Sequence, residues 1–387
     1  MKSTTREKTT EKIQKLRQLL HQFPELSGNE KGTRKRLTDF FRELNTDAFY
    51  DDIGGKSMAW EFSGESPETT VIFRADMDAL PIEDEIDEPY RSENESVGHK
   101  CGHDGHMAVL AGLASRLSEN PPSKTRIICL FQAEEETGQG AEKIVNHQWF
   151  RKLNPDYVFG LHNLPGFEQG TIIARQGIFA SASVGMIIKL KGKSSHAGHP
   201  EEGISPAGAI ANLTDFIIHE IDFSSFHDFS LATIIHFSLG EVAFGTSPGF
   251  GRFMLTLRAA REDDLEKLIA IIEDKCREVS HKEGLGYEIS FTERFPSTEN
   301  HEEGYGLVLQ AAKDCSYRVE TPGSPFSWSE DFGHYLKNCK GAFFGLGAGK
   351  KTPGLHHPDY DFPDEILENG IDMFYKICRI LENEKRI

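Results

Sequence analysis

Side chains that can do chemistry recur at the ends of short apolar runs in this sequence. Asp76 and Asp78 follow the first such run, and three consecutive glutamates, 134–136, follow the second. His162 comes directly after the third run. Carboxylate or imidazole groups thus follow each of these apolar runs, which indicates one shared site.

Two further segments add thiol and imidazole groups to this set. Cys101-Gly-His103-Asp-Gly-His106 precedes a helix-like stretch over 107–117, and His356-His357 follows the last apolar run through a glycine-rich link. One thiolate, several imidazoles and a carboxylate form a borderline-soft donor set that suits zinc, with manganese, cobalt or nickel possible. Calcium and magnesium fit this set poorly.

Adjacent glutamates can divide the work at such a metal. One binds the ion, and its neighbour stays free to take a proton from water. A metal lowers the pKa of its water from 15.7 to about 7, and a general base adds roughly 10²–10⁴-fold in rate. The residues alone leave open which of the glutamates plays which part.

Each motif also has a plainer interpretation. Three glutamates are typical of a solvated helix start, and a Cys-x-His pair can be a buried thiol beside an incidental histidine. His162 could simply close a strand, and His356 and His357 could be loop residues. Their joint placement at strand ends favours the metal site.

The elements that position these residues follow from hydrophobic periodicity. Helical spacing predicts an opening helix over 7–21, which Pro24 and Gly28 end. Apolar runs predict buried strands at four places, alternating with helical segments: 70–73, 125–131, 157–161 and 342–346. This alternation predicts an α/β fold with a mostly parallel sheet flanked by helices, where ligands gather outside the carboxyl ends of the strands.

A different pattern interrupts this alternation. Strand-like and helix-like segments follow in the order βαββαβ, which is typical of a ferredoxin-like unit: 185–191, 205–221, 230–237, 252–257, 262–283 and 287–292. We therefore expect a catalytic domain formed by 1–180 and 295–387, with an inserted domain over 181–294.

Composition narrows the classes of partner. A net charge of −18, from 61 acidic against 43 basic residues, disfavours nucleic acid. No apolar stretch reaches the roughly 20 residues of a membrane span, and the start lacks a signal-peptide pattern. We expect a soluble cytoplasmic protein that does not bind membranes, with its six cysteines reduced.

Taken together, the motifs resemble the aminoacylase and exopeptidase superfamily of metal-dependent hydrolases. The similarity is greatest to its amidohydrolase branch, which includes hippurate hydrolases and auxin-conjugate hydrolases. It covers nearly the whole chain and rests on these segments: His21-Gln-Phe-Pro-Glu25-Leu, Arg74-Ala-Asp-Met-Asp-Ala-Leu-Pro81, Cys101-Gly-His-Asp-Gly-His106, Glu135-Glu136, His162, Gly192-Lys-Ser-Ser-His196, Ser329-Glu-Asp-Phe332 and Leu355-His356.

The resemblance implies a site for two divalent ions. Cys101 would bridge them, with His103 and His162 on one ion and Glu136 and His356 on the other. By the same matching, Glu135 is the general base. Asp78 matches a carboxylate that contacts a metal ligand and fixes its orientation.

The inserted domain resembles the family's lid and dimerisation domain, so the resemblance implies a homodimer. His196 matches a histidine that reaches a neighbouring subunit's site to steady the developing oxyanion. Arg258 lies in a family-like Thr-Leu-Arg segment and could bind a substrate carboxylate. The plainer interpretation of His196 is a solvent-exposed histidine at a strand end. The plainer interpretation of Arg258 is a surface charge.

Two departures from the family pattern concern the substrate. Where relatives carry an asparagine that helps to hold substrate, this chain has Gly245. Where relatives have Gln-Pro-Ala before the glutamate pair, it has Gln132-Ala-Glu134, which adds a third carboxylate.

The leading hypothesis is hydrolysis of the amide bond in N-acyl amino acids. Within the same superfamily, the alternative is a dipeptidase or carboxypeptidase acting on short peptides. Two other classes stay open: a metal-containing binding protein without turnover, and a thiol-dependent hydrolase with Cys101 as nucleophile.

Overall fold

The chain folds into two compact units. In the computed structural model, residues 2–383 are described, with side chains from residue 9 onward. Unit 1 takes the chain up to Phe179, then Thr298–Ser324 and the chain from Asp331. Unit 2 comprises Ala180–Ser297 and the short segment Pro325–Glu330.

Unit 1 is built on an eight-stranded sheet with the order β1-β2-β4-β3-β5-β16-β6-β15. Its centre consists of parallel strands, as predicted: β4 (Thr125–Gln132), β3 (Thr69–Asp76), β5 (Tyr157–Pro165) and β16 (Lys340–Gly349). Nearly every residue of these strands is buried, so both faces of the sheet are covered.

The edges of this sheet were not predicted. An antiparallel hairpin and two very short strands complete it: β1 (Ala48–Ile53), β2 (Ser57–Ser63), β6 (Ile172–Ile173) and β15 (Val319–Glu320). A separate two-stranded ribbon pairs β7 (Gly177–Ala180) with β14 (Thr298–Asn300).

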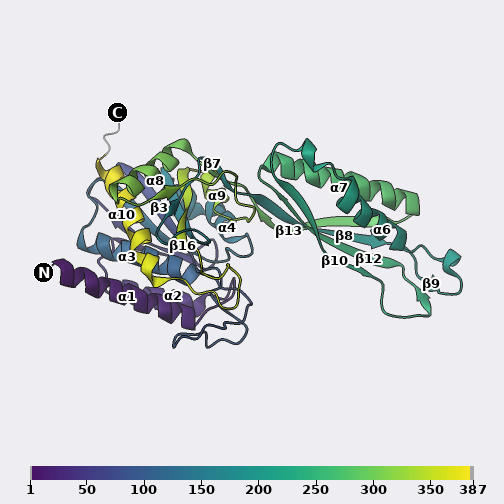
Figure 1. Cartoon of the computed structure of the whole chain (residues 1–387), viewed down its shortest axis with the longest axis horizontal. Helices are drawn as coiled ribbons and strands as arrows, with labels where there is room; N and C mark the ends of the chain where they lie inside the picture. The colour runs from purple at the N-terminus through teal and green to yellow at the C-terminus, as the bar shows by residue number, and fades with distance from the viewer. Residues whose placement is uncertain (1, 384–387) are drawn as a thin grey trace. The chain divides into compact units, whose positions relative to one another are not determined.

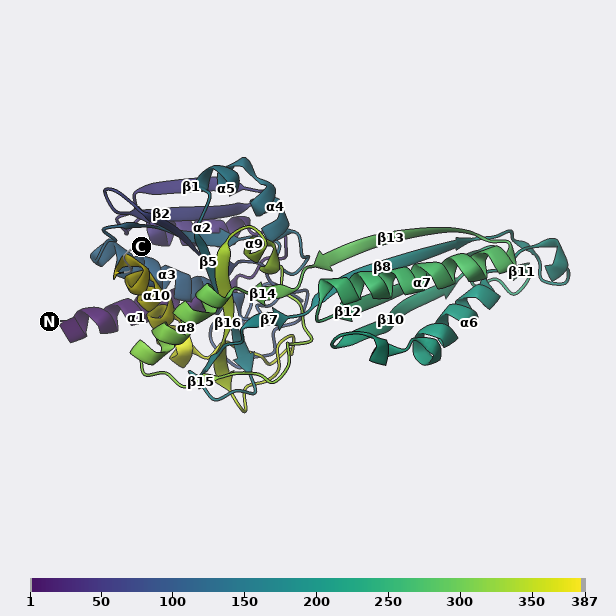
Figure 2. The ribbon, with the colours of Figure 1, turned by 90° about the horizontal axis from the view of Figure 1, so that it is seen from above.

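Four long helices of unit 1 pack together beside the sheet, as Figures 1 and 2 show: α1 (Lys2–Gln22), α3 (His103–Glu119), α8 (Glu302–Asp314) and α10 (Leu367–Asn383). Shorter helices complete the unit: α2 (Lys31–Phe41), α4 (Gly140–Asn146), α5 (Gln148–Leu153), α9 (Gly333–Leu336) and the 3-10 turn Asp364–Ile366. The main core lies between the sheet and the long helices, where Leu110, Phe73 and Phe374 are fully or almost fully buried.

Two element boundaries differ from the prediction in a way that matters for the site. Helix α3 begins at His103 rather than Met107, so His103 and His106 stand in its first turn. Strand β5 continues to Pro165, so His162 lies inside the strand and not after it. The apolar pattern ends at polar ligands, whereas backbone hydrogen bonding continues through them.

Unit 2 has the predicted βαββαβ order. Its four-stranded antiparallel sheet has the order β10-β12-β8-β13, formed by β8 (Ala182–Lys191), β10 (Ser230–Leu239), β12 (Phe250–Ala259) and β13 (Gly286–Phe295). Helices α6 (Ala207–Asp215) and α7 (Glu262–Glu283) cover one face, as seen in Figure 2. The helix expected over 205–221 is α6 followed by a separate π turn, Phe216–Glu220.

Small elements complete unit 2. Strands β9 (Ser195–His196) and β11 (Thr246–Ser247) pair with each other, and 3-10 turns occupy Pro200–Glu202 and Phe223–Ser225. None of the helices within residues 2–383 combines the length and apolar content needed to cross a bilayer.

Candidate metal and active site

The turn before α3 brings Cys101 and His103 to the sheet. Between them, Gly102 adopts a left-handed conformation with φ of 89°. A Cβ at this position would lie 2.5 Å from Asn163 Oδ1, so glycine is required on two counts. This turn places Cys101 Sγ 3.3 Å from His162 Nε2 on β5.

All five predicted metal ligands meet in unit 1. Ligand atoms of Cys101, His103 and His162 lie within 4.8 Å of one another, and so do those of Cys101, Glu136 and His356. We call these five residues the ligand cluster. Because Cys101 belongs to both trios, the geometry provides two neighbouring three-ligand positions that share one sulfur. A further trio joins His103 to Glu135 and Glu136.

Unsatisfied polar atoms test whether cations fit this cluster. His103 Nε2 and Glu136 Oε1 are buried, lie 3.7 Å apart and have no hydrogen-bond partner within residues 9–383. Burying such atoms unpaired costs free energy, so proteins rarely leave them so. A cation between the imidazole nitrogen and the carboxylate oxygen would satisfy both, and the residues therefore fit a metal.

Backbone carbonyls set the tautomers of the two buried histidines. His103 Nδ1 donates to the carbonyl oxygen of Asp78 at 2.8 Å, and His162 Nδ1 donates to that of Asn163 at 2.8 Å. Nε2 is therefore the nitrogen that each ring offers to a metal, and on His103 a bound cation would replace the Nε2 proton.

Asp78 supports the cluster a second time through its side chain. Its Oδ2 accepts hydrogen bonds from Ser27 Oγ at 2.7 Å and from the backbone N–H of Glu136 at 3.0 Å. The aspartate therefore contacts both the strand-end turn that carries Glu136 and the histidine of α3.

The three glutamates occupy a tight turn rather than a solvated helix start. Glu135 is only 6% exposed, and its Oε2 lies 4.0 Å from His103 Nε2. Glu134 adopts a positive φ of 61° and forms an ion pair with Lys143. The third carboxylate, noted in the sequence as an addition near the site, is therefore neutralised by a lysine of α4.

The pKa values reflect crowded negative charge. Burial raises the pKa of Glu136 to about 7, although His103 opposes the shift. Burial alone would lower the pKa of His103, but Asp76, Asp78 and Glu136 outweigh it and raise the pKa to about 10. Burial holds the pKa of His162 well below its usual value, so this ring is neutral. The cluster thus attracts cations and offers a neutral imidazole.

A buried polar network that the sequence did not predict lies next to the cluster. Arg74 donates to Asp76 at 2.7 Å and to Asp331 at 2.9 Å, and Gln132 also donates to Asp331. His106 Nδ1 lies 2.6 Å from Asp76 Oδ1. The sequence did contain a signal for this network, because Arg74, Asp76 and Asp78 alternate along one strand and its end.

The remaining predicted residues, His196 and Arg258, belong to unit 2. His196 Nδ1 accepts a hydrogen bond from the backbone N–H of Gly198 at 3.0 Å, so the proton sits on Nε2 of an exposed ring. Arg258 Nη1 donates to Ser327 O at 3.2 Å and to Ser329 Oγ at 3.0 Å. Among the described residues, no carboxylate pairs with Arg258, and burial lowers its pKa.

Comparison with known proteins identifies the family. Residues 72–380 match the domain described as peptidase family M20/M25/M40. The chain belongs to this family. It is 30% identical over 369 residues to N-acetyldiaminopimelate deacetylase of Exiguobacterium sibiricum, covering 93% of this chain and 98% of that one. YhaA of Bacillus subtilis, provisionally named an amidohydrolase, is 30% identical over 374 residues, covering 92% and 91%.

Solved structures agree on the fold. The YXEP protein of Bacillus subtilis, described as a dinuclear metal binding peptidase of the M20 family, has a TM-score of 0.81 at 23% identity. The match covers 97% of this chain and 99% of that one. As a member of the M20 family with amidohydrolase relatives, the chain is a hydrolase that acts on amide bonds.

Proposed function

We propose that this M20 hydrolase cleaves the amide bond of N-acyl amino acids in the cytoplasm and uses two divalent ions. The observation that carries the proposal is the sharing of Cys101 between two adjacent ligand trios, with Glu135 buried beside them. Named relatives support it, because one removes an acetyl group from an amino acid and another structural relative binds two metals. The donor set suits zinc, manganese, cobalt or nickel.

In this proposal the ligand cluster holds the cations, with His103 and His162 on one side of Cys101 and Glu136 and His356 on the other. When bound, the cations supply Lewis acidity that activates water and stabilises negative charge. Glu135 takes the proton from the attacking water and gives it to the leaving nitrogen, whose bond to the acyl carbon breaks. Asp78 keeps His103 oriented.

Unit 2 supplies the remaining groups in this proposal. His196 donates a hydrogen bond from its Nε2–H group to the oxyanion in the site of a neighbouring copy. This role suits the tautomer that the hydrogen bond from Gly198 favours. Arg258 binds the substrate carboxylate, which suits a half-buried guanidinium with no carboxylate partner among the described residues.

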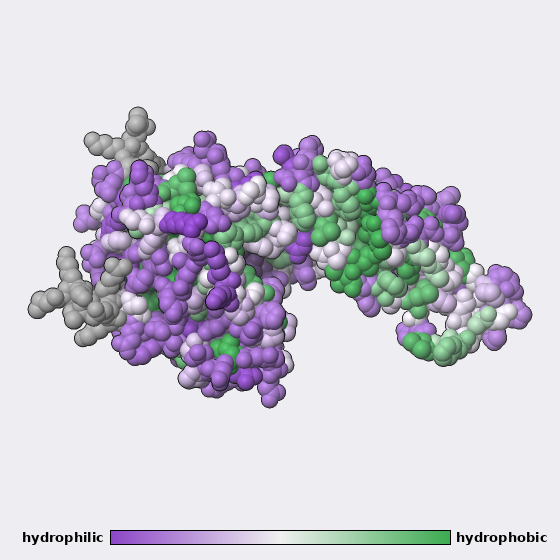
Figure 3. Space-filling model, in the orientation of Figure 1, coloured by the Kyte–Doolittle hydropathy of each residue, from purple (hydrophilic) through white to green (hydrophobic). Residues whose placement is uncertain are grey.

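Two copies of the chain would associate through the outer edge of unit 2. Strand β10 ends its sheet, and its outer backbone groups pair with no other described strand. Ile235 and Phe237 of β10 are 60% and 53% exposed, and Ile218 beside α6 is 59% exposed. Figure 3 shows hydrophobic side chains gathered on this part of unit 2.

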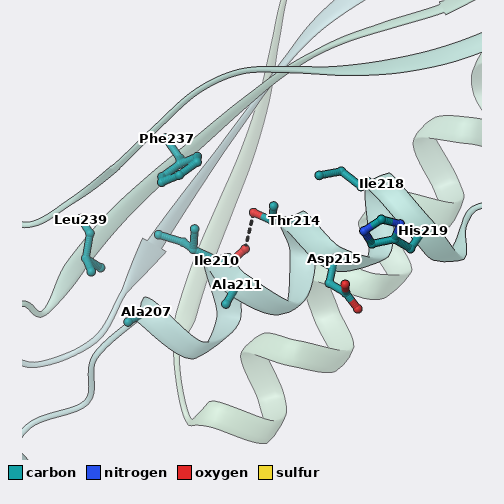
Figure 4. A pocket seen from close by; sticks show the side chains of 9 residues that line it. All are labelled: Ala207, Ile210, Ala211, Thr214, Asp215, Ile218, His219, Phe237 and Leu239. Carbon is teal, nitrogen blue, oxygen red and sulfur yellow. Dashed lines mark hydrogen bonds between the residues drawn. The ribbon is translucent and has the colours of Figure 1, made fainter.

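A groove of about 490 Å³ separates β10 from α6. In Figure 4, Phe237 and Leu239 of β10 lie across this groove from Ile210 and Ile218. An antiparallel edge strand can pair with the same strand of a second copy about a two-fold axis, so one patch serves both partners. This arrangement supports the homodimer that the family resemblance implies.

One experiment tests the proposed reaction. The purified protein is analysed for metal and then offered N-acetyl, N-benzoyl and longer-chain acyl amino acids beside dipeptides and longer peptides. Release of the free amino acid from the acyl substrates is the expected result. Turnover of peptides alone would establish a dipeptidase or carboxypeptidase instead, and ligand binding without any product would establish a non-catalytic binding protein.

The contact between Cys101 and His162 favours a specific second candidate. A thiol 3.3 Å from an imidazole nitrogen is also the pair that a cysteine nucleophile requires. Metal removal separates the two readings. Under the metal proposal, a chelator abolishes activity and divalent ions restore it. A chelated protein that keeps full activity and loses it on thiol alkylation would be a cysteine hydrolase.

A further inference from the structure

A second group of buried charges lies in unit 1, outside the ligand cluster. We call it the ionic cluster, and all but one of its members are at most 3% exposed: Arg17, His21, Asp84, Lys100, Asp104 and the partly exposed Asp361. Arg17 and His21 come from α1, and Asp104 from the first turn of α3. Helices that are distant in sequence are thus joined by charges at one buried point.

His21 stands at the centre of this cluster. Its Nδ1 lies 2.8 Å from Asp104 Oδ2, and its Nε2 lies 3.1 Å from Asp84 Oδ2. Ionised carboxylates only accept hydrogen bonds, so both ring nitrogens must donate and the ring is an imidazolium. Burial alone would lower the pKa of His21, but Asp104 and Asp84 outweigh it and raise the pKa to about 9.

Each of the two aspartates holds one end of the metal-binding turn. Asp104 directly follows His103, and Asp84 forms a buried ion pair with Lys100, which directly precedes Cys101. His21 is therefore connected to both ends of the Lys100–Asp104 turn, and neither connection involves a ligand atom.

The same turn also forms a hydrogen bond with His356. Lys100 O accepts a hydrogen bond from the backbone N–H of His356 at 2.8 Å, and Lys100 Nζ donates to Tyr360 O at 2.8 Å. His356 has a positive φ of 64°, which is unfavourable for a residue with a side chain. Its placement consequently depends on the position of Lys100.

A third metal ion is the other use that this cluster suggests, because His21, Asp104 and Asp361 bring ligand atoms together. Existing cations argue against it. Arg17 Nη1 donates to Asp361 at 2.7 Å, and the His21 imidazolium already binds Asp104. A metal ion would have to displace positive charges that satisfy these carboxylates.

We propose that His21 is a positioning residue of the metal site. Its ring holds Asp84 and Asp104 in place, so that the Lys100–Asp104 turn presents Cys101 and His103 to the cations. This inference rests on the metal site of the proposed function. It gives His21, part of the first motif in the chain, a role that spacing could not show.

Cobalt binding tests this role independently of turnover. Co²⁺ is titrated into the metal-free wild type, His21→Gln and Arg116→Gln against a competing chelator, and the visible absorption of the cobalt–thiolate centre is recorded. Arg116 is the matched control, because it lies on α3, the helix that carries Asp104, and donates to Asp372 and Glu368 at 2.6 Å, away from the turn. Both substitutions should lower the melting temperature.

Only His21→Gln should weaken Co²⁺ binding, by about 10–100-fold, the range found when residues behind metal ligands are lost. It should also alter the absorption spectrum, which a purely stabilising residue would leave unchanged. A His21→Gln protein with the affinity and spectrum of the wild type overturns the inference. Should the wild type bind no Co²⁺, the proposed function fails instead.

A second variant covers the case in which His21→Gln does not fold. Asp84→Asn keeps the size of the side chain but removes the charge that faces His21 and Lys100. The inference expects weaker Co²⁺ binding and a changed spectrum for this variant as well. Wild-type affinity in folded Asp84→Asn protein would contradict it.

Discussion

Three neighbouring glutamates have the same side chain but different surroundings. Glu135 is buried beside His103, whereas Glu134 turns away through a left-handed backbone and pairs with Lys143. The backbone N–H of Glu136 donates a hydrogen bond to Asp78 Oδ2, and its side chain belongs to the ligand cluster. In the proposed reaction the base must lie near the attacking water, and Glu135 meets this condition because it is buried beside His103, whereas Glu134 pairs with Lys143.

Replacement of Glu135 tests this assignment. Glu135→Gln keeps the shape of the side chain but cannot accept the proton, so kcat should fall by about 10²–10⁴-fold. Metal content should stay at the wild-type value. Glu134→Gln is the control and should keep most of the activity. If Glu135→Gln turned over substrate at the parental rate, another group would be the base.

The charge on His21 predicts how stability depends on pH. Its folded pKa of about 9 exceeds the ordinary value of 6.5, so its contribution is complete below 6.5 and is lost as the pH rises through 9. The difference in unfolding free energy between metal-free wild type and His21→Gln should shrink by about 3 kcal/mol from about pH 6 to about pH 10.

Denaturant unfolding at several pH values provides this measurement. Asp84 and Asp104, whose pKa values are depressed, titrate only in acid and do not change over this range. His103 also has a raised pKa, but it is present in both proteins and cancels in the difference. A difference that stays constant with pH would show that His21 is not charged.

At the scale of elements, the site depends on where strands and helices stop. The carboxyl ends of β3 and β4 meet at one edge of the sheet, because their chains run parallel. Helix α3 begins at that edge, and its first turn supplies His103 and His106. The turn at Gly102 joins these elements, and its left-handed backbone against Asn163 leaves no room for a side chain.

An alanine at Gly102 should therefore cost both stability and metal affinity. Gly166 has a similar φ of 90°, but a Cβ there meets nothing within 4 Å, so Gly166→Ala is a matched control. The control should lose only about 1 kcal/mol from backbone strain. Gly102→Ala should lose about 2–4 kcal/mol, since Asn163 must also move, and should bind metal more weakly.

Chemical denaturation of the metal-free proteins and Co²⁺ titration check these two expectations. Equal losses in the two variants would mean that contact with Asn163 does not constrain the turn.

At the scale of the whole molecule, exposed apolar surface on β10 needs an explanation. Each Å² of apolar surface removed from water contributes about 25 cal/mol, so burial of this edge against a second copy would be stabilising. The opposite edge strand, β13, also exposes a phenylalanine, but its neighbours on the strand include Glu288, Glu293 and Arg294. Charges of this kind discourage edge pairing.

These two edges offer a paired test of the dimer. Phe237→Asp on β10 should convert a dimer to a monomer, because the charge would be buried in the interface. Phe291→Asp on β13 should leave the dimer intact. Light scattering after size-exclusion chromatography gives the mass directly. A wild type that is monomeric at all concentrations, or a Phe237→Asp dimer, would rule out this interface.

The sequence by itself determined the kind of chemistry and the plan of the fold. The thiol of Cys101, the three glutamates 134–136 and the imidazole of His356 can be recognised from spacing as groups suited to a metal, and apolar periodicity located the parallel core strands and the βαββαβ unit. Hydrophobic periodicity is a local property, so it survives in one dimension. Assignment of single roles came from resemblance rather than from spacing.

Only the tertiary structure decided which polar groups meet. His21 and Asp104 are 83 positions apart, and Arg74 and Asp331 are 257 apart, yet both pairs are buried and hydrogen-bonded. No local pattern encodes such pairs, because they form where packed elements exclude water and each buried charge must find a partner. The tertiary structure likewise placed His162 inside β5 and paired Glu134 with Lys143, since those outcomes depend on neighbours from other segments.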